Sequence, residues 1–413
     1  QWYLFRPRRQ QQEGAARMNL PGTYISLFSG CGGLDVGFAQ RGFQGRAAYD
    51  LDPAAVKVHS ANLGAHCFVK DLASAMPLDL LPGGGPPDVL LSGSPCQGFS
   101  LAGKRRLDDP RNSLLLRSAE IATAVRPKVF VAENVTGATY GEHGLYWSQL
   151  EERMRAAGYA TATLRLDARA HGLAQSRMRV VLLAWTGGAL LRVPQAPAGV
   201  ATVGSSLAGV ARAPQHKPQQ LAQDSPLAKI AARIGPGQKL SNVRGGARSV
   251  HTWHIPEVFG PTTQCEQNVL QAIQRLRRSE RRRDRGDADP VLITSLEREL
   301  GPQANYHVQA LVGKGYVRQV GEGFDLTHTF NGKFRRLDWS GQSITVDTRI
   351  GDPRYFLHPT EHRGLTVREA ARLQGFPDDF AFEVPERSAY RMIGNAVPPP
   401  MAAHVAEVVR SLL

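Results

Sequence analysis

Short apolar runs alternate with amphipathic stretches through the first 185 residues of the chain. A short apolar run bounded by turn residues predicts a buried strand, whereas apolar residues at helical spacing predict a helix. The predicted strands are Thr23–Phe28, Arg46–Tyr49, Asp88–Ser92, Lys128–Ala132 and Arg179–Trp185, and the predicted helices include Pro53–Asn62, Ser113–Val125 and Tyr146–Ala157. This alternation predicts an α/β fold with a doubly wound, mostly parallel sheet that has helices on both faces.

The pattern changes after Trp185. Residues 187–223 are rich in Gly, Ala and Pro, which predicts a linker and an irregular lobe. Residues 265–327 then predict three helices and a two-stranded ribbon, at Gln267–Arg283, Ile293–Leu300, Tyr306–Val312 and Tyr316–Thr327. That order is typical of a winged-helix unit. Amphipathic helices are predicted again at Thr366–Leu373 and Pro399–Leu413.

The charge of the chain indicates a polyanionic partner. The 413 residues carry 50 Lys and Arg against 36 Asp and Glu, a net charge of +14. Residues 188–362 hold 23 basic and 15 acidic residues, so the excess is greatest there, and Arg275–Arg285 is its densest point. Clustered cations bind nucleic acid by displacing phosphate counterions, although such a run can also be a solvated helix face.

Several other classes of protein are disfavoured. An apolar content of 42% is enough for a core and excludes wholesale disorder. No apolar run approaches the length of a membrane span and no signal-peptide pattern is visible, so a cytoplasmic protein is expected. The four cysteines, Cys31, Cys67, Cys96 and Cys265, are too sparse for a disulfide scaffold and lack the spacing of a metal site. We therefore expect no metal, and any cysteine with a function is expected to be a reactive thiol.

A glycine-rich turn follows the first predicted strand. It contains Phe28, Gly30, Cys31, Gly32 and Gly33 and leads into a helix, where the backbone can approach an anionic ligand closely. The glycine spacing differs from the dinucleotide pattern, which disfavours a nicotinamide dehydrogenase.

Two carboxylates follow the next predicted strands. Asp50 can accept hydrogen bonds from both hydroxyls of a ribose, and Asp71 can reach an adenine amino group. Either residue taken singly is more often a cap or a surface group. Together with the glycine turn, they predict a cofactor of the adenosine type.

Cys96 directly follows the predicted strand that ends at Ser92. Pro95 and Gly98 hold the turn around it, as a rigid and exposed nucleophile requires, whereas a buried structural cysteine is the alternative. A basic loop follows that could close over a phosphate backbone; its cations are Lys104, Arg105, Arg106 and Arg111.

Glu133 lies at the end of another predicted strand. A glutamate there can hydrogen-bond nitrogen 3 of a pyrimidine, and pairing with a neighbouring arginine is its structural alternative. Arg177 and Arg179 in the segment Gln175–Arg179 are the candidate partners.

These segments together resemble the cytosine-5 DNA methyltransferase family. Six segments appear in the order of that family: Phe28–Leu34, Pro95–Gln97, Glu133–Val135, Gln175–Arg179, Arg363–Pro377 and Gly394–Pro398. The match covers residues 23–185 and 363–410, and it is loose around Gln342–Thr345. Ala174 and Ser343 stand where the family often has proline and threonine.

The resemblance implies a Rossmann-like methyltransferase fold with a discontinuous catalytic domain. The expected parts are a basic tail at 1–17, with Met18 as a candidate start, and a catalytic domain at 18–187 plus 388–413. Residues 188–387 are expected to form the target recognition domain, with the winged-helix insertion at 265–327. DNA contacts of that insertion are expected through Arg275–Arg285 or through a recognition helix near Asn305–Leu311.

The resemblance also implies the chemistry. A cytosine is flipped out of double-stranded DNA, Cys96 attacks carbon 6, and Glu133 with Arg177 and Arg179 holds the base while carbon 5 takes a methyl group from S-adenosylmethionine. The implied cofactor-binding residues are Phe28, Gly30, Cys31, Gly32, Gly33, Asp50, Leu51, Asp71, Leu72, Pro95, Leu114, Asn395, Ala396 and Val397.

Two other functions stay open at this point. One is a transfer-RNA cytosine methyltransferase, although the long basic middle region favours duplex DNA. The other is a catalytically silent DNA-binding regulator on the same fold, which the presence of Cys96, Glu133 and Arg177 disfavours. The pattern leaves open the recognised DNA sequence and a restriction endonuclease or defence-system partner.

Overall fold

The computed structural model describes residues 22–83, 85–95, 112–196, 199–283, 286 and 288–413. The chain folds into two compact units. Unit 1 comprises the chain up to Leu166, Arg179–Gln195 and Met401–Leu413, and unit 2 comprises Asp167–Met178 and Ala196–Pro400. Each unit is therefore assembled from separate stretches of sequence.

A seven-stranded sheet in the order β3-β2-β1-β4-β5-β7-β6 forms the centre of unit 1. The strands are β1 (Thr23–Leu27), β2 (Gln44–Asp50), β3 (Cys67–Val69), β4 (Val89–Ser92), β5 (Val129–Val135), β6 (Ala160–Asp167) and β7 (Met178–Trp185). The pairs from β3 through β5 are parallel, and β7 runs antiparallel to β5. The predicted mostly parallel α/β sheet is confirmed.

Two strands of this sheet, β3 and β6, are absent from the sequence prediction. Strand β3 has only three residues, two of them exposed, and β6 alternates polar and apolar residues with most positions only partly buried. A short or half-exposed edge strand lacks the continuous apolar run that identified the other strands.

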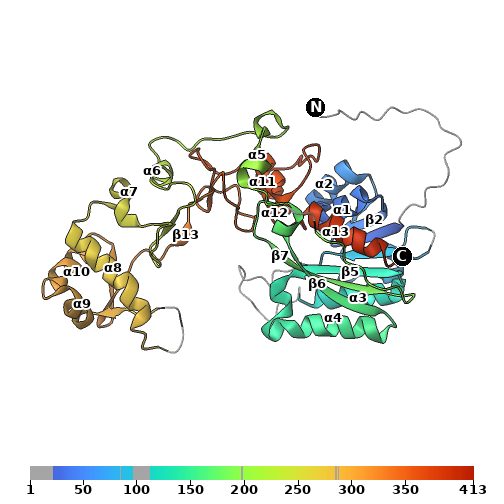
Figure 1. Cartoon of the computed structure of the whole chain (residues 1–413), viewed down its shortest axis with the longest axis horizontal. Coiled ribbons are helices and arrows are strands. Elements are labelled where there is room, and N and C mark those ends of the chain that lie inside the picture. The colour runs from blue at the N-terminus through green and yellow to red at the C-terminus, as the bar shows by residue number, and fades with distance from the viewer. Residues whose placement is uncertain (1–21, 84, 96–111, 197–198, 284–285, 287) are drawn as a thin grey trace. The chain divides into compact units, whose positions relative to one another are not determined.

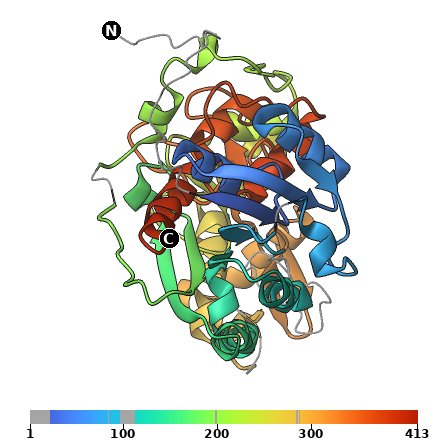
Figure 2. The same cartoon turned by 90° about the vertical axis from the view of Figure 1, so that its right-hand side faces the viewer.

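Helices cover both faces of the sheet (Figures 1 and 2). Helices α3 (Ser113–Val125) and α4 (Gly144–Ala156) share one core with Ile25 and Leu27 of β1. Because side chains alternate along a strand, Ser26 faces the opposite side, where its hydroxyl donates to Asp35 of α1 (Gly33–Gln40) at 3.0 Å. Helix α2 (Pro53–Leu63) begins with Asp52 as N-cap.

The last helix, α13 (Pro399–Arg410), packs closely against α1. A Cβ atom added to Gly37 would lie 2.4 Å from the Cβ of Ala402, so a side chain larger than hydrogen has no room there. Helix α13, near the carboxyl end of the sequence, thus packs in unit 1 against α1, which lies near the amino end of the sequence.

Unit 2 contains short helices and three small sheets. Outside residues 264–326, the α-helices among its described residues are α5 (Val203–Leu207), α6 (Pro226–Ala232), α7 (Pro256–Phe259), α11 (Val367–Gln374) and α12 (Glu386–Asn395). One sheet has the order β13-β8-β9, with β8 (Lys239–Ser241), β9 (Ser249–Val250) and β13 (Asn331–Lys333), and β14 (Arg335–Arg336) pairs with β15 (Phe356–Leu357). The segment 187–223, predicted to be irregular, contains only α5 and short 3₁₀ turns as regular structure among its described residues.

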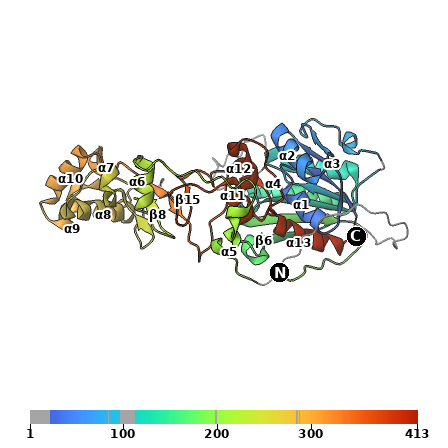
Figure 3. The same ribbon diagram turned by 90° about the horizontal axis from the view of Figure 1, so that it is seen from above.

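The secondary-structure elements of residues 264–326 follow the order helix, strand, helix, helix, strand, strand. These elements are α8 (Gln264–Ser279), β10 (Val291–Leu292), α9 (Ile293–Leu300), α10 (Ala304–Gly313), β11 (Val317–Val320) and β12 (Gly323–Leu326), and the sheet order is β10-β12-β11. The three helices lie together with α7 (Figure 3) and bury Leu270, Leu296 and Leu311 in one core. Three helices followed by a two-stranded ribbon are thus present, with the short strand β10 added between α8 and α9.

No helix within the described part of the chain is long and apolar enough to cross a membrane.

Candidate functional site

The glycine turn after β1 adopts a backbone that other residues rarely take. Phe28, Gly30 and Gly32 have φ angles of 52°, 55° and 96°. A Cβ at Gly32 would lie 2.6 Å from Leu63 and 2.9 Å from His59, so glycine is required at this position. Among the described residues no side chain caps the amino end of α1, which leaves the N–H groups of its first turn available to an acceptor.

Asp50 at the carboxyl end of β2 is fixed against this turn. Its Oδ2 accepts from the N–H of Gly30 at 2.8 Å, and its Oδ1 accepts from the N–H of Asp52 at 2.9 Å. Burial raises the pKa of the Asp50 carboxyl, and these hydrogen bonds partly offset that rise. The neighbouring Leu51 is 66% exposed, an unusual position for a leucine unless something packs on it.

Asp71 follows β3 and is exposed. Its Oδ1 accepts from the N–H of Ala73 at 3.0 Å, so part of the carboxylate stabilises its own turn. Leu72 is 2% exposed and belongs to the core of unit 1, so its side chain faces away from solvent. Of this pair, only Asp71 presents its side chain to a ligand.

Cys31 lies in the glycine turn but is a buried thiol. Burial raises its pKa to about 12, and the charges of Asp50 and Asp35 act in the same direction. Since the thiolate is the reactive form, Cys31 is unsuited to nucleophilic attack.

Cys96 and the basic loop with Lys104, Arg105, Arg106 and Arg111 lie outside the described residues. The segment that leads to Cys96 is described and is firmly held. The amide of Asn134 donates to the carbonyl and the hydroxyl of Ser94 at 3.4 and 3.3 Å, and Gly93 donates to Leu27 at 3.1 Å. Strand β5 therefore fixes the backbone just before the predicted nucleophile, where Pro95 is half-buried.

Glu133 and Arg179 form a buried ion pair between β5 and β7. The Nε of Arg179 lies 2.7 Å from Oε1 of Glu133, and their side chains are 11% and 9% exposed. Glu133 is opposite Val181 in the sheet, so Arg179, two residues along β7, points to the same face. The predicted pairing of these two residues is thus present in the structure.

Arg177 donates to three backbone carbonyls of unit 2. Its Nη1 donates to the carbonyl of Val346 at 2.8 Å, and its Nη2 donates to the carbonyls of Gly394 and Ala396 at 3.0 and 2.8 Å. The side chain is 1% exposed. These contacts make Arg177 a residue that holds the backbone of 394–396.

Two glutamines extend this network. Gln175 donates to Oε1 of Gln374 at 2.7 Å, and Gln374 donates to the carbonyls of Ile393 and Ala396 at 2.9 and 2.6 Å. Both glutamines are fully buried. The three segments Gln175–Arg179, Arg363–Pro377 and Gly394–Pro398, far apart in sequence, are therefore joined through one set of buried hydrogen bonds.

The segment around Ser343 pairs with the residues before Arg177. Ser343 donates from its N–H to the carbonyl of Ala174 at 2.8 Å and accepts from the N–H of Ser176 at 2.9 Å. The hydroxyl of Thr345 donates to the carbonyl of Ser176 at 2.6 Å. Ala174 and Ser343, the two residues that differ from the family pattern, are thus hydrogen-bonded to each other through their backbones. Neither side chain is needed for this pairing.

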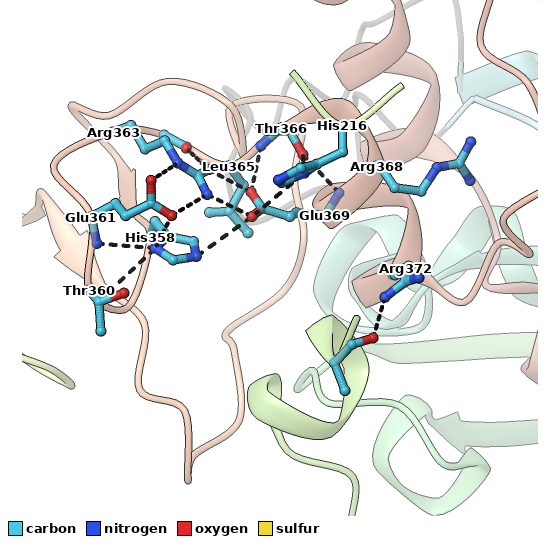
Figure 4. A network of polar contacts seen from close by, with 12 residues as sticks. His216, His358, Thr360, Glu361, Arg363, Leu365, Thr366, Arg368, Glu369 and Arg372 are labelled. Carbon is cyan, nitrogen blue, oxygen red and sulfur yellow. Dashed lines mark hydrogen bonds and ion pairs between the residues drawn. The ribbon is translucent and has the colours of Figure 1, made fainter. Parts of the chain in front are cut away.

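A buried ionic cluster next to α11 was missed by the sequence reasoning (Figure 4). Arg363 bonds both oxygens of Glu369 at 2.7 and 2.8 Å and also pairs with Glu361 at 2.8 Å. Glu369 also accepts from the N–H of Thr366, whose hydroxyl caps α11. The Thr-x-x-Glu spacing is a capping box and was the available signal.

The other predicted cofactor residues lie in different surroundings. Leu114 in α3 is partly exposed. Asn395 is exposed, Ala396 is partly exposed and Val397 is 9% exposed, at the end of α12.

Comparisons with known proteins agree on one family. A model described as C-5 cytosine-specific DNA methylase matches residues 22–411. The Type II methyltransferase M.XorII of Xanthomonas oryzae pv. oryzae is 31% identical over 402 residues, which are 94% of this chain and 84% of that protein. The Type II methyltransferase M.AgeI of Thalassovita gelatinovora is 29% identical, over 94% of this chain and 98% of that protein.

Two solved structures are similar in fold. A DNA modification methyltransferase encoded within an E. coli prophage has a TM-score of 0.56 and 22% identity, over 94% of this chain and 98% of that chain. The methyltransferase EhMeth of Entamoeba histolytica has a TM-score of 0.54 and 13% identity, over 94% and 97%.

Proposed function

This chain belongs to the C-5 cytosine-specific DNA methylase family and is a DNA (cytosine-5)-methyltransferase, and on that premise we propose that it methylates carbon 5 of a flipped cytosine in duplex DNA through a covalent adduct with Cys96. The buried ion pair between Glu133 and Arg179 is the observation that carries the proposal. A carboxylate of low exposure at the end of a parallel strand, oriented by a guanidinium, is suited to hydrogen-bond a heteroaromatic base.

The residues around the glycine turn fit S-adenosylmethionine, the methyl donor that this family generally uses. The uncapped amino end of α1 leaves the backbone N–H groups of its first turn for the methionine part, and Asp50 offers a carboxylate to the ribose. The exposed side chain of Leu51 offers an apolar surface to the adenine. Bound there, S-adenosylmethionine would supply an electrophilic methyl carbon. The assignment of Pro95, Leu114, Asn395, Ala396 and Val397 rests on the resemblance alone.

Cys96 is assigned the nucleophilic step. Its Sγ forms a bond to carbon 6 of the cytosine while Glu133 supports a proton at nitrogen 3, so that carbon 5 becomes nucleophilic. Carbon 5 would take the methyl group as the bond from the methyl carbon to the sulfonium sulfur breaks and leaves a neutral thioether. The proton on carbon 5 then passes to a base, the double bond between carbons 5 and 6 re-forms, Cys96 leaves as a thiolate, and the proton at nitrogen 3 returns to Glu133. Arg179 orients Glu133, and Arg177 acts as a positioning residue through the backbone of Gly394 and Ala396.

Duplex DNA is the proposed substrate, and residues 188–387 are the proposed recognition domain. Carbon 5 is out of reach of the catalytic residues in a stacked duplex, which is why the base must be extruded. The Type II designation of the relatives supports a role in restriction and modification, in which a cognate endonuclease would fail to cut DNA methylated by this protein.

The test is covalent trapping on duplex DNA that contains 5-fluorocytosine, with S-adenosylmethionine present. Fluorine at carbon 5 cannot leave as a proton, so we expect a stable adduct that resists denaturing electrophoresis. Cys96→Ala is expected to abolish the adduct, and Cys265→Ala, which removes an exposed thiol, is the matched control that keeps it. Bisulfite sequencing of DNA from cells expressing each variant then locates the methylated cytosine.

Other outcomes would identify the alternatives. DNA binding without an adduct would indicate a silent regulator on this fold. An adduct that forms on transfer RNA and not on duplex DNA would assign the enzyme to the RNA-modifying branch.

A further inference from the structure

Four cations lie on and beside the β13-β8-β9 sheet of unit 2 and are called here the phosphate face. They are Lys239, Arg244, Arg248 and Arg335. Within the described part of the chain, no carboxylate forms an ion pair with any of them. Other exposed arginines do have such a partner, for example Arg233 with Glu257 and Arg354 with Asp352.

The alternation of side chains along the strands creates this face. Leu240 and Val250 are buried with Phe334 in one core, so the adjacent Lys239 points to the opposite side of the sheet. A Cβ added to Gly332 would lie 2.9 Å from Nη2 of Arg335 and 3.5 Å from Cδ of Lys239. The side chains of Arg335 and Lys239 therefore converge above the backbone of β13.

Arg335 and Arg336 are consecutive in sequence and have opposite roles. Arg336 is 4% exposed and donates to the carbonyls of Ala231, Ile234, His358 and Glu361, at distances from 2.6 to 2.8 Å. Arg335 is only partly buried, and its Nε is buried without a hydrogen-bond partner among the described residues. Arg336 thus stabilises the fold through its hydrogen bonds, whereas the guanidinium of the partly exposed Arg335 retains a donor without a partner in the described part of the chain.

The four cations repel one another. Burial lowers the pKa of Lys239, and the positive charges of Arg335 and Arg244 lower it further. Burial and the charge of Arg248 likewise lower the pKa of Arg335. Arg244 and Arg248 are exposed in the connection between β8 and β9, where an approaching anion can reach them. Such repulsion is relieved when a polyanion binds.

The arginine run near the end of α8 differs in this respect. Arg277 is buried and paired with Asp325 at 2.9 Å, Arg275 is paired with Glu299, and Arg283 is paired with Asp289. Arg281 and Arg282 donate to backbone carbonyls of Arg283 and Pro290. The densest basic segment of the sequence is thus largely occupied with intramolecular contacts.

We propose that the phosphate face binds the phosphate backbone of duplex DNA and supplies a sequence-independent share of the affinity. This inference rests on the proposed function, because it takes the DNA substrate from there. Guanidinium groups bind phosphate oxygens in a planar, bidentate geometry, and a surface with four unpaired cations presents several positive charges at once. Contacts of this kind position a protein on DNA and leave base reading to other residues.

The test is the salt dependence of duplex DNA binding by the full chain and by Arg244→Gln/Arg248→Gln/Arg335→Gln. Each phosphate contact contributes about 0.9 to the slope of log K against log salt, so we expect the slope to fall by about 2.7 in the triple variant. The ratio of the DNA affinity of the unmodified protein to that of the triple variant should accordingly fall about 40-fold as the salt concentration rises from 50 to 200 mM. The KM for DNA should rise at low salt while kcat stays unchanged.

A charge-matched control is Arg41→Gln/Arg153→Gln/Arg155→Gln. These arginines of unit 1 are exposed and are paired with Glu407, Glu120 and Glu151, respectively. The control is expected to keep the slope of the unmodified protein, although it loses the same net charge. Arg244→Gln/Arg248→Gln, which changes only exposed residues, is expected to lower the slope by about 1.8 and guards against misfolding of the Arg335 variant.

The outcomes separate this inference from the proposed function. Equal slopes in the triple variant and the unmodified protein, with fluorocytosine trapping intact, would refute the phosphate face and leave the methyltransferase proposal standing. A slope that falls for duplex RNA but not for duplex DNA would also overturn it. Failure of the unmodified protein to bind or to be trapped on DNA would count against the proposed function itself.

Discussion

Gln175 and Gln374 are joined by a 2.7 Å hydrogen bond between two side chains that are fully shielded from solvent, although the two residues are 199 positions apart in the sequence. The side-chain amide of Gln374 in turn donates to the carbonyl of Ala396, which also accepts a hydrogen bond from Arg177. Buried polar networks of this kind are stabilising only when each member is satisfied. The pair thus holds the backbone of the Gly394–Pro398 segment.

Replacing Gln374 by Ala is expected to raise the Kd for S-adenosylmethionine and to lower the free energy of unfolding by about 1–3 kcal/mol, because buried carbonyls lose their donors. Isothermal calorimetry and urea unfolding measure the two effects. Gln219→Ala, at an exposed position, is the control and should change neither. An unchanged cofactor affinity together with the stability loss would limit the role of Gln374 to packing.

Replacing Gly30 by Ala tests the glycine turn separately from its packing. The φ angle of Gly30 is 55°, and no described atom lies within 4 Å of an added Cβ, so the backbone cost should be about 1–2 kcal/mol. The affinity for S-adenosylmethionine is expected to fall at least tenfold, because the Cβ of the alanine would project into the open space at this turn, where the cofactor is proposed to bind. Gly209→Ala, with a φ of 69° and equally open space, should show the stability cost alone.

Breaking the ion pair of Arg179 with Glu133 is expected to be costly. Arg179→Met leaves a buried carboxylate without its cation, so the free energy of unfolding should fall by about 3–5 kcal/mol. Arg153→Met, which breaks the exposed pair with Glu120, should cost less than about 1 kcal/mol.

In the folded protein, Glu133→Gln should lower kcat by about 10²–10⁴-fold, measured as tritium transfer to DNA. A full rate in Glu133→Gln would remove Glu133 from the mechanism.

The buried pair of His59 and Asp35 beneath the glycine turn predicts a pH dependence of stability. Burial by itself would lower the pKa of His59, but the charge and hydrogen bond of Asp35 raise it to about 10. A histidine with a raised pKa contributes stability that is complete below its ordinary value of 6.5 and is lost as the pH rises toward 10. The free energy of unfolding should therefore decrease by at most about 1.4 kcal/mol per pH unit in that range.

The comparison variant is His59→Gln, in which this decrease should disappear. Urea unfolding at pH 6.5, 8 and 9.5 measures both proteins. Parallel curves for the two would show that His59 is neutral in the folded state.

Helix α10 is expected to read bases, because its exposed residues Asn305, Tyr306 and Gln309 are uncharged and Tyr306 is 72% exposed. Amide side chains can form bidentate hydrogen bonds with adenine, and each such contact contributes about 1–3 kcal/mol of discrimination. Asn305→Ala/Gln309→Ala should broaden the methylated sequence in bisulfite profiles without changing the salt slope. Gln271→Ala on α8 is the control, and an unaltered profile of the double variant would exclude α10 from recognition.

Much of the fold was predictable because its information is local. The strands β1, β4, β5 and β7 are rich in apolar residues, β2 contains the short run Ala47–Tyr49, and Ser113–Val125 begins and ends as its periodicity predicts. The candidate functional segments were also recognisable, since the glycine turn, Glu133 and Gln175–Arg179 each combine characteristic residue types within a few positions of the sequence. A short edge strand such as β3 carries too few buried residues to be distinguished from a loop.

The sequence by itself determined the class of sheet, the order of its motifs and the choice of candidate residues for the chemistry. Only the tertiary structure decided what those residues contact: it paired Arg179 with Glu133, gave Arg177 to backbone carbonyls, and left the cations of the phosphate face unpaired while Arg275 and Arg277 of α8 found carboxylate partners. The reason is that residue type and periodicity are properties of neighbouring positions, whereas an ion pair depends on which distant carboxylate the fold brings within a few ångströms of each cation.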